Sequence, residues 1–152
     1  MFINRFKKPF KKMVILISII GSPFLLAGEE GETYSEINLD QFIEEQTSAV
    51  GKTLIVVPFN LKTEAVLKSY PEERTVEYLY TALQLMKVDP LPEVNHRMFI
   101  ESEKGKIIPV YVDDHAAPFI KKGLQLDKKA TFLGYHVYNY SKGPAIVIEA
   151  FE

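Results

Sequence analysis

The residues best suited to chemistry are Asp113, Asp114 and His115, together with His136. Carboxylates and imidazoles are ligands of zinc and manganese, so a metal-dependent hydrolase is one hypothesis. Adjacent residues on a strand point to opposite faces, however, so Asp113 and Asp114 reach one ion only if the strand has ended. The competing interpretation is that the two acids cap a helix at about 116–122. We expect His136 to be a core or interface residue with one satisfied hydrogen bond, and we expect neither a metal nor a cofactor.

A catalytic nucleophile is not expected. The serines beyond position 27 fall in predicted turns or caps, without a neighbouring histidine motif: Ser35, Ser48, Ser69, Ser102 and Ser141. The acid pairs at 44–45 and 72–73 fall on predicted helices, where neighbours diverge by about 100° and cannot act as an acid–base pair. The sequence also contains no phosphate-binding loop. We therefore predict a protein that is not an enzyme.

Tyrosine is the remaining chemical feature. Four tyrosines lie in the last third of the chain, at Tyr111, Tyr135, Tyr138 and Tyr140. Tyrosine combines apolar area with a polar tip, which suits a binding surface, although strands favour tyrosine for their own reasons. We expect Tyr111 to lie on an outward face beside Arg97, where both contact a partner that also adds a strand to an exposed sheet edge.

The segment 1–27 is predicted to be a signal peptide. Five basic residues precede an apolar run from 13 to 27, which is short for a bilayer span of roughly 20 apolar residues. We expect cleavage after Ala27, an acidic stub at 28–32 and a periplasmic or secreted protein. An uncleaved anchor is the alternative. In the main interpretation the chain meets a membrane only through this segment before cleavage.

Charge and composition narrow the remaining possibilities. The chain has 152 residues, enough for one domain, and it has no cysteine, which excludes disulfides and thiolate chemistry. All 20 acids but only 13 of the 18 basic residues follow position 27, so the exported part carries a net charge of −7. Such a chain is a poor ligand for nucleic acid, because phosphate neutralisation supplies most of that affinity. Nucleic-acid binding is therefore not expected.

Two helices and one strand are predicted in the first half of the exported part. Residues 40–50 have an apolar face behind a cap at Asn38 or Asp40, and 53–57 form a β-branched run typical of a buried strand. Ser69 and Glu72 have the spacing of a capping box, with Pro71 in the first turn. These residues predict a second helix over 70–87.

Two hairpins are predicted after it. A three-residue loop at 103–105, ending in Gly105, places the apolar residues of 98–112 on one face. A similar loop at 141–143 would pair Tyr135 with Glu149. Glu149 should then face water, and the inward residues are expected to be Gly134, His136, Tyr138, Ile146 and Ile148.

Two stretches carry a resemblance to a known family. INLDQFIEEQTSAVGKTLIVVP, followed by LKSYPEERTVEYLYTALQLM, resembles the periplasmic amino-terminal domain of secretins, which are the outer-membrane pores of type II secretion and type IV pili. A related short domain begins many TonB-dependent transducers. The resemblance covers about 33–101. It departs at Val57, where the family has an acid, at 61–68, which has helix-favouring composition where the family has a strand, and at the Pro-rich stretch 89–92. No pore domain follows.

The resemblance implies an α+β fold with two helices packed on small mixed sheets. A secretin-like domain would occupy 33–112, and a helical turn and β-hairpin at 113–152 would extend the same globule. The implied function is a non-enzymatic protein–protein interaction domain, an accessory of a secretion or pilus assembly in the envelope. The alternative is an oligonucleotide/oligosaccharide-binding (OB) type of β-barrel, built from 52–58 and 97–151, that binds a small ligand or sugar. Closure of the hairpins into a barrel would favour this alternative; the oligomeric state stays open.

Overall fold

The computed structural model describes residues 33–49, 51, 59–137 and 145–152. Their helices and strands follow one another along the chain in this order: β1 (Ser35–Glu36), α1 (Leu39–Ala49), β2 (Asn60–Leu67), β3 (Glu72–Glu73), α2 (Glu77–Leu85), β4 (His96–Glu101), β5 (Ile107–Val112), α3 (Ala117–Gly123), β6 (Lys129–Val137) and β7 (Ala145–Phe151). None of the described helices is long and apolar enough to cross a membrane.

Five of the strands close into a barrel. Neighbours run in the order β2–β6–β7–β5–β4, and the end of β2 returns to β4 through the pairs Val66–Glu101 and Leu67–Ile100. All these pairings are antiparallel except β5–β7, and α3 lies in the connection between β5 and β6. This is the arrangement of an OB-like barrel. The α+β class is thus confirmed, and closure favours the barrel alternative over a helix pair on separate small sheets.

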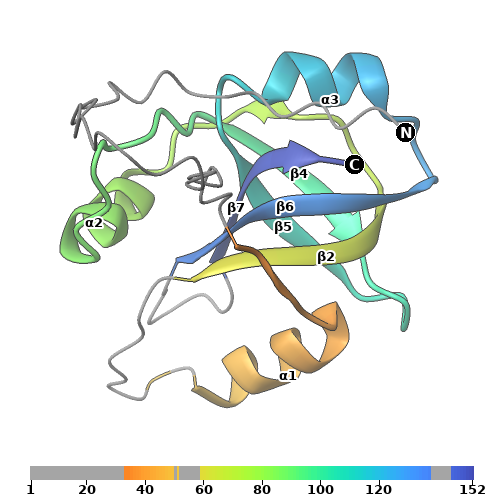
Figure 1. Ribbon diagram of the computed structural model, residues 1–152, viewed down its shortest axis with the longest axis horizontal. Helices are drawn as coiled ribbons and strands as arrows, with labels where there is room; N and C mark the ends of the chain where they lie inside the picture. The colour runs from red at the N-terminus through yellow and green to blue at the C-terminus, as the bar shows by residue number, and fades with distance from the viewer. Residues whose placement is uncertain (1–32, 50, 52–58, 138–144) are drawn as a thin grey trace, which may run out of the picture.

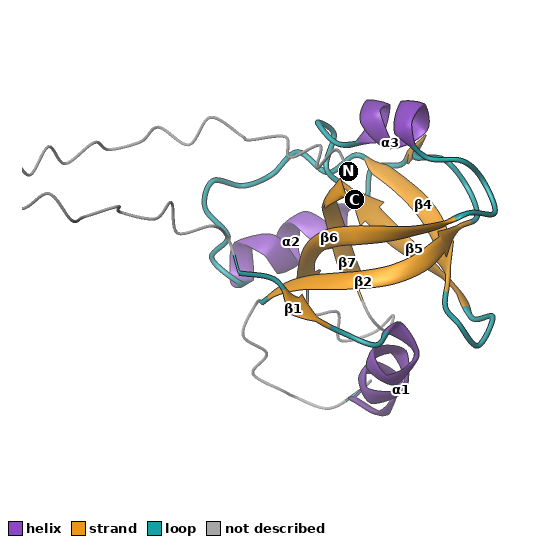
Figure 2. Ribbon diagram, turned by 45° about the vertical axis from the view of Figure 1, so that its right-hand side comes forward, coloured by secondary structure: helices purple, strands orange, loops and turns teal. Residues whose placement is uncertain are grey.

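The three helices lie around this barrel. Figure 1 shows α1 and α3 on opposite sides of it and α2 on a third side, and Figure 2 shows the same placement after a turn of the view. One apolar cluster fills the barrel and includes Leu39 and Phe42 of α1 and Ile120 of α3. A second cluster, outside the barrel wall, joins Leu79 and Leu83 of α2 to the outer side of β5, β6 and β7. Both faces of the wall are therefore buried beneath α2.

The residues of β2 form a strand although their composition favours a helix. The buried residues of β2 alternate as Leu61, Thr63, Ala65 and Leu67, which is the period of a strand with one face in the core. Burial of this face inside a closed barrel outweighs the weak helix preference of the individual residues. The strand predicted at 53–57 lies outside the described residues.

The first predicted hairpin is confirmed. Met98 pairs with Val110 and Ile100 with Ile108, which leaves 103–105 as a three-residue loop. Gly105 adopts φ +80°, the left-handed conformation that this loop requires. The start of α1 is also as expected, because the Asn38 side chain accepts a hydrogen bond from the Gln41 amide at 3.0 Å.

The second helix is shorter than the sequence predicts. It begins at Glu77, not at position 70, because the preceding segment has other hydrogen-bond partners. The Ser69 hydroxyl accepts from the Phe99 amide at 2.9 Å, and Glu72 and Glu73 pair with β4 as strand β3. The capping box is therefore wrong. The apolar face that it was expected to introduce is present, with Leu79 and Leu83 fully buried.

The second hairpin has the predicted faces but a different register. Tyr135 pairs with Val147 and not with Glu149, and an irregularity lies between Leu133 and Gly134. The observed register differs from the predicted one by two positions. A shift by an even number of positions leaves every side chain on the same face of the sheet, so the hydrophobic pattern of the sequence cannot distinguish the two registers. His136, Ile146 and Ile148 are buried inward as expected, whereas Tyr138 and the loop at 141–143 lie outside the described residues.

Candidate functional site

The outer face of β4 and β5 is partly exposed. Met98 and Val110 face the barrel core, so the alternate residues point outward. Two cross-strand pairs form this face, Phe99 with Pro109 and Glu101 with Ile107, and Arg97 adjoins them. Ile107 is 54% exposed and Pro109 is also exposed. We name this surface the β4–β5 platform; it consists of Arg97, Phe99, Glu101, Ile107 and Pro109.

Charged groups border the apolar centre of the platform. The Arg97 guanidinium lies 5.1 Å from the centroid of the Phe99 ring, a cation–π distance. At the other end, Glu101 lies 3.6 Å from the Lys68 amine, which also contacts Asp127 at 2.6 Å. The hydrogen bond to Asp127, with the charge of Glu101, raises the pKa of Lys68, although partial burial opposes the change. An apolar strip with a charged border is typical of a binding surface.

Tyr111 does not belong to the exposed part of this face. It pairs with Arg97 as predicted, but it is only 8% exposed because α2 covers it. Its hydroxyl shares a hydrogen bond with the Tyr78 hydroxyl of α2, and the two rings meet edge to face with centroids 6.2 Å apart. The expected outward position of Tyr111 is therefore wrong. The turn register gave its face correctly, but nothing local indicated that a helix from an earlier part of the chain covers this face.

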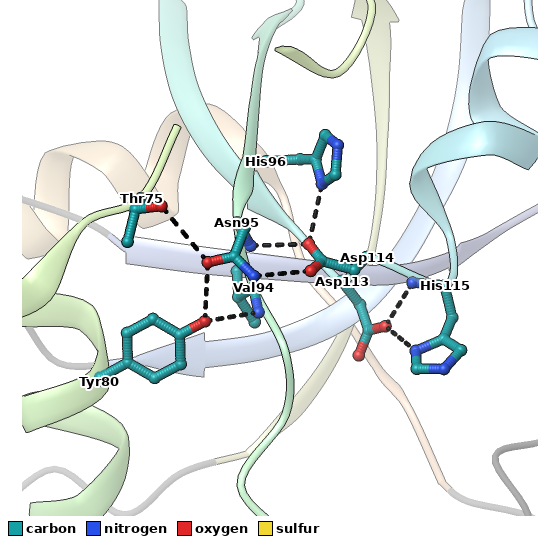
Figure 3. Close-up of polar contacts among 8 residues, drawn as sticks. All are labelled: Thr75, Tyr80, Val94, Asn95, His96, Asp113, Asp114 and His115. Atoms are coloured by element: carbon teal, nitrogen blue, oxygen red, sulfur yellow. Dashed lines mark hydrogen bonds and ion pairs between the residues drawn. The ribbon is translucent and has the colours of Figure 1, made fainter. Parts of the chain in front are cut away.

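A network of polar side chains lies beside the platform, at the start of β4 (Figure 3). Asp114 accepts hydrogen bonds from the backbone and side-chain nitrogens of Asn95, each at 2.7 Å, and from His96 Nδ1 at 2.8 Å. Tyr80 of α2 donates to Asn95 Oδ1 at 3.1 Å and accepts from the Val94 amide at 3.1 Å. The network thus ties α2, the start of β4 and the end of β5 together.

The electrostatics of Asp114 agree with a fixed, ionised carboxylate. Burial alone would raise the pKa of Asp114, but the hydrogen bonds from Asn95 and His96 outweigh it and leave the pKa below its usual value. An oriented Asp–His pair is part of the machinery of acyl-transfer enzymes. In the described part of the chain, however, no hydroxyl is hydrogen-bonded to His96. The contacts present support a positioning role for the pair. His96 is not among the site residues predicted from the sequence. Its partner Asp114 follows β5, whereas His96 begins β4, so no local spacing relates the two.

The residues first considered for metal binding are not brought together. Asp113 accepts from the backbone and ring nitrogens of His115 at 2.9 and 3.1 Å, in the turn before α3, while Asp114 holds His96. Figure 3 shows each imidazole against a different acid. No group of three or more metal-ligating side chains forms among the described residues. The α3 helix itself, predicted at 116–122, is confirmed.

His136 lies elsewhere, inside the barrel end beneath α1. It is fully buried, with the Phe42 ring edge-on at 5.2 Å and the Phe59 ring at 5.5 Å. Neither ring nitrogen has a hydrogen-bond partner within the described residues, so the single satisfied bond expected from the sequence is wrong. Burial lowers the pKa of His136 to about 4, which keeps the imidazole neutral at physiological pH.

The remaining predicted tyrosines add little to the surface. The Tyr135 hydroxyl is buried without a hydrogen-bond partner in the described part of the chain, and burial, followed by the charges of Glu149 and Asp113, raises its pKa. Tyr135 belongs to the packing beneath α2. Tyr138 and Tyr140 lie outside the described residues. Of the three predicted binding residues that the structure describes, only Arg97 thus lies on the β4–β5 platform.

An open groove of about 280 Å³ lies between β1, α1 and β2 and is lined mainly by Glu36, Asp40, Glu64 and Glu103. Three of these acids already have partners. Asp40 accepts from the Ser102 hydroxyl at 2.6 Å, and Lys129 reaches Glu64 at 2.7 Å and Glu103 at 3.8 Å. Most of the acids that line the groove therefore form contacts within the protein, and one of these, from Asp40 to Ser102, joins α1 to the end of β4.

Comparison with known proteins finds no match: no protein-family model, no curated protein and no solved structure matches the chain.

Proposed function

We propose that this chain is an exported, non-enzymatic binding protein that presents the β4–β5 platform to a protein partner in the cell envelope. The observation that carries the proposal is the apolar strip on the outer face of β4 and β5, formed by the exposed Ile107 and Pro109 and the half-buried Phe99 and bordered by Arg97 and Glu101. In OB-like barrels the corresponding pair of strands is the usual ligand face. The secretin-like stretches and the predicted signal peptide support an envelope location and a secretion or pilus assembly as the setting.

The partner is expected to bind through side chains and not by adding a strand. Barrel closure pairs the long strands, and among the described strands only β1 and β3 stand at the ends of the sheet order. Each is two residues long and carries glutamate, Glu36 in β1 and Glu72 with Glu73 in β3. Short, charged edges discourage strand addition. This favours the platform over a strand edge as the site of contact.

Oligosaccharide binding is the second candidate. The observation that favours it is the Phe99 ring with Arg97 beside it on the ligand face of an OB-like barrel, since aromatic faces and planar polar groups also suit sugars. Metal-dependent hydrolysis gains no support from the arrangement of Asp113, His115 and His136.

The test places a photo-crosslinking amino acid at position 107 and, as a matched control, at Leu85. Leu85 is an equally apolar residue that is 78% exposed on α2, away from the platform. Irradiation of producing cells should give a discrete protein adduct from position 107 and none from position 85, and Phe99→Ala should abolish it without lowering the melting temperature. Adducts of equal yield from both positions would contradict the proposal. Absence of any adduct, with glycan binding that Phe99→Ala removes, would replace it with the sugar-binding function.

A further inference from the structure

Charge is unevenly distributed along this acidic chain. Between His115 and Ile148 the only acid is Asp127, whereas the same stretch contains five lysines. Four of them fall within 121–129, in α3 and the turn that follows it. Such asymmetry indicates a surface with a partner of its own.

Three of these lysines carry charge that no described acid neutralises. No ion pair within the described residues involves Lys121, Lys122 or Lys128, and Asp127, the one acid between His115 and Ile148 in the sequence, is held by Lys68 at 2.6 Å. Lys129, in contrast, is paired with Glu64 at 2.7 Å. The positive charge at this end of the molecule is therefore available to an external anion.

Two apolar residues lie close to these lysines in the sequence. Phe119 is 38% exposed and Leu126 is 42% exposed, while Ile120, the residue after Phe119 in α3, is fully buried in the apolar cluster that fills the barrel. The α3 face, defined as Phe119, Lys121, Lys122, Leu126 and Lys128, thus combines cations with exposed apolar groups. The helix α3 itself lies on the side of the barrel opposite α1 (Figure 1).

We propose that the α3 face docks on an anionic membrane surface. Lysines with an aromatic residue and a leucine are the composition of segments that lie at the headgroup boundary. Protein interfaces, by contrast, are depleted in lysine and enriched in arginine, and this face has no arginine. Flexible point charges without fixed partners suit a fluid layer of anionic headgroups. This inference is independent of the platform and adds a membrane contact beyond the predicted signal peptide.

The test uses a local reporter, which the chain allows because it contains no tryptophan. Leu126→Trp is compared with Leu85→Trp, a matched exposed leucine on α2, in protein purified with its natural N-terminus. Vesicles containing phosphatidylglycerol should shift the emission of the tryptophan at 126 to shorter wavelength, whereas phosphatidylcholine vesicles should not. The tryptophan at 85 should respond to neither. The shift should weaken as salt rises, because the attraction is screened.

Charge variants decide whether the lysines are responsible. Lys121→Glu with Lys122→Glu, in the Leu126→Trp background, should lower the partition coefficient by about 25-fold or more, at about fivefold per lysine. The control, Arg74→Glu with Lys87→Glu, makes the same change in net charge elsewhere and should lower it far less. An equal loss in both, an equal shift of both reporters, or binding to neutral vesicles would each overturn the proposal. A shift caused by soluble polyglutamate and not by vesicles would overturn it in favour of an acidic protein partner.

Discussion

Burial sets the protonation state of individual side chains in this protein and their effect on stability. His136 shows this most directly, because the Phe42 and Phe59 rings surround an imidazole whose nitrogens have no described partner. Burying a neutral imidazole without a hydrogen bond costs free energy, and burying a charged imidazole there would cost much more. The residue is therefore a source of pH-dependent stability and not a candidate ligand.

The free energy of unfolding should fall in acid because of His136. Its folded pKa of about 4 lies below the unfolded value of 6.5, so the unfolded state takes up a proton first. Stability should be complete above about pH 6.5 and should be lost towards pH 4, by about 3 kcal/mol at about 1.4 kcal/mol per pH unit. Urea titrations at pH 7 and pH 4.5 should show this loss in the wild type and much less of it in His136→Leu. His115→Gln, at an exposed histidine, is the control and should behave as the wild type.

Gly134 is a residue at which a single methyl group should be costly. An added Cβ would lie 1.9 Å from the Val147 carbonyl oxygen, a backbone atom that cannot rotate away. We expect Gly134→Ala to destabilise by about 3 kcal/mol or more. Gly105→Ala is the comparison, since nothing lies near its Cβ and only its φ of +80° opposes the change, at about 1 kcal/mol. Equal melting temperatures for the two variants would contradict the close approach of β6 and β7.

Among the elements, α2 decides how much of the barrel wall is available to a partner. It covers Tyr111 and the outer side of β6 and β7, and its position is fixed by the Tyr78 hydroxyl and by Tyr80 in the Asn95–Asp114 network. The uncovered part of β4 and β5 is left as the platform. The helix thus sets the boundary of the proposed site.

The buried face of α2 should respond to substitution very differently from its exposed face. Leu83 is fully buried, so Leu83→Ala should cost about 2–5 kcal/mol. Gln84→Ala, on the exposed side, should change stability by no more than about 0.5 kcal/mol. Chemical denaturation of both variants measures the difference, and similar losses would mean that α2 packs through another face.

On the scale of the whole molecule, every described helix and strand follows the predicted signal peptide at 1–27 in the sequence. The first described strand begins at Ser35, and the barrel is closed by the pairing of β2 with β4. Cleavage after Ala27 would therefore remove no residue of a described helix or strand. Mass spectrometry of the protein from fractionated cells should give an N-terminus near Gly28. Recovery of chains that retain Met1 would favour the uncleaved anchor.

The sequence by itself determined the features that depend on neighbouring residues. These are the capped start of α1, narrowed to Asn38 or Asp40, the left-handed Gly105 in the first hairpin, the apolar face of α2 and the inward side of β6 and β7. Each follows from turn chemistry or from the period of a helix or strand, which a few adjacent residues fix.

Only the tertiary structure decided the strand at β2, the late start of α2, the shifted β6–β7 register and the burial of Tyr111. Each of these depends on partners far along the chain: β6 for β2, β4 for Ser69 and Glu72, and α2 for Tyr111. Propensities worth a fraction of a kcal/mol per residue yield to burial worth about 1.5–3 kcal/mol for a large apolar side chain. The platform and the α3 face exist for the same reason, because barrel closure selects which side chains stay at the surface.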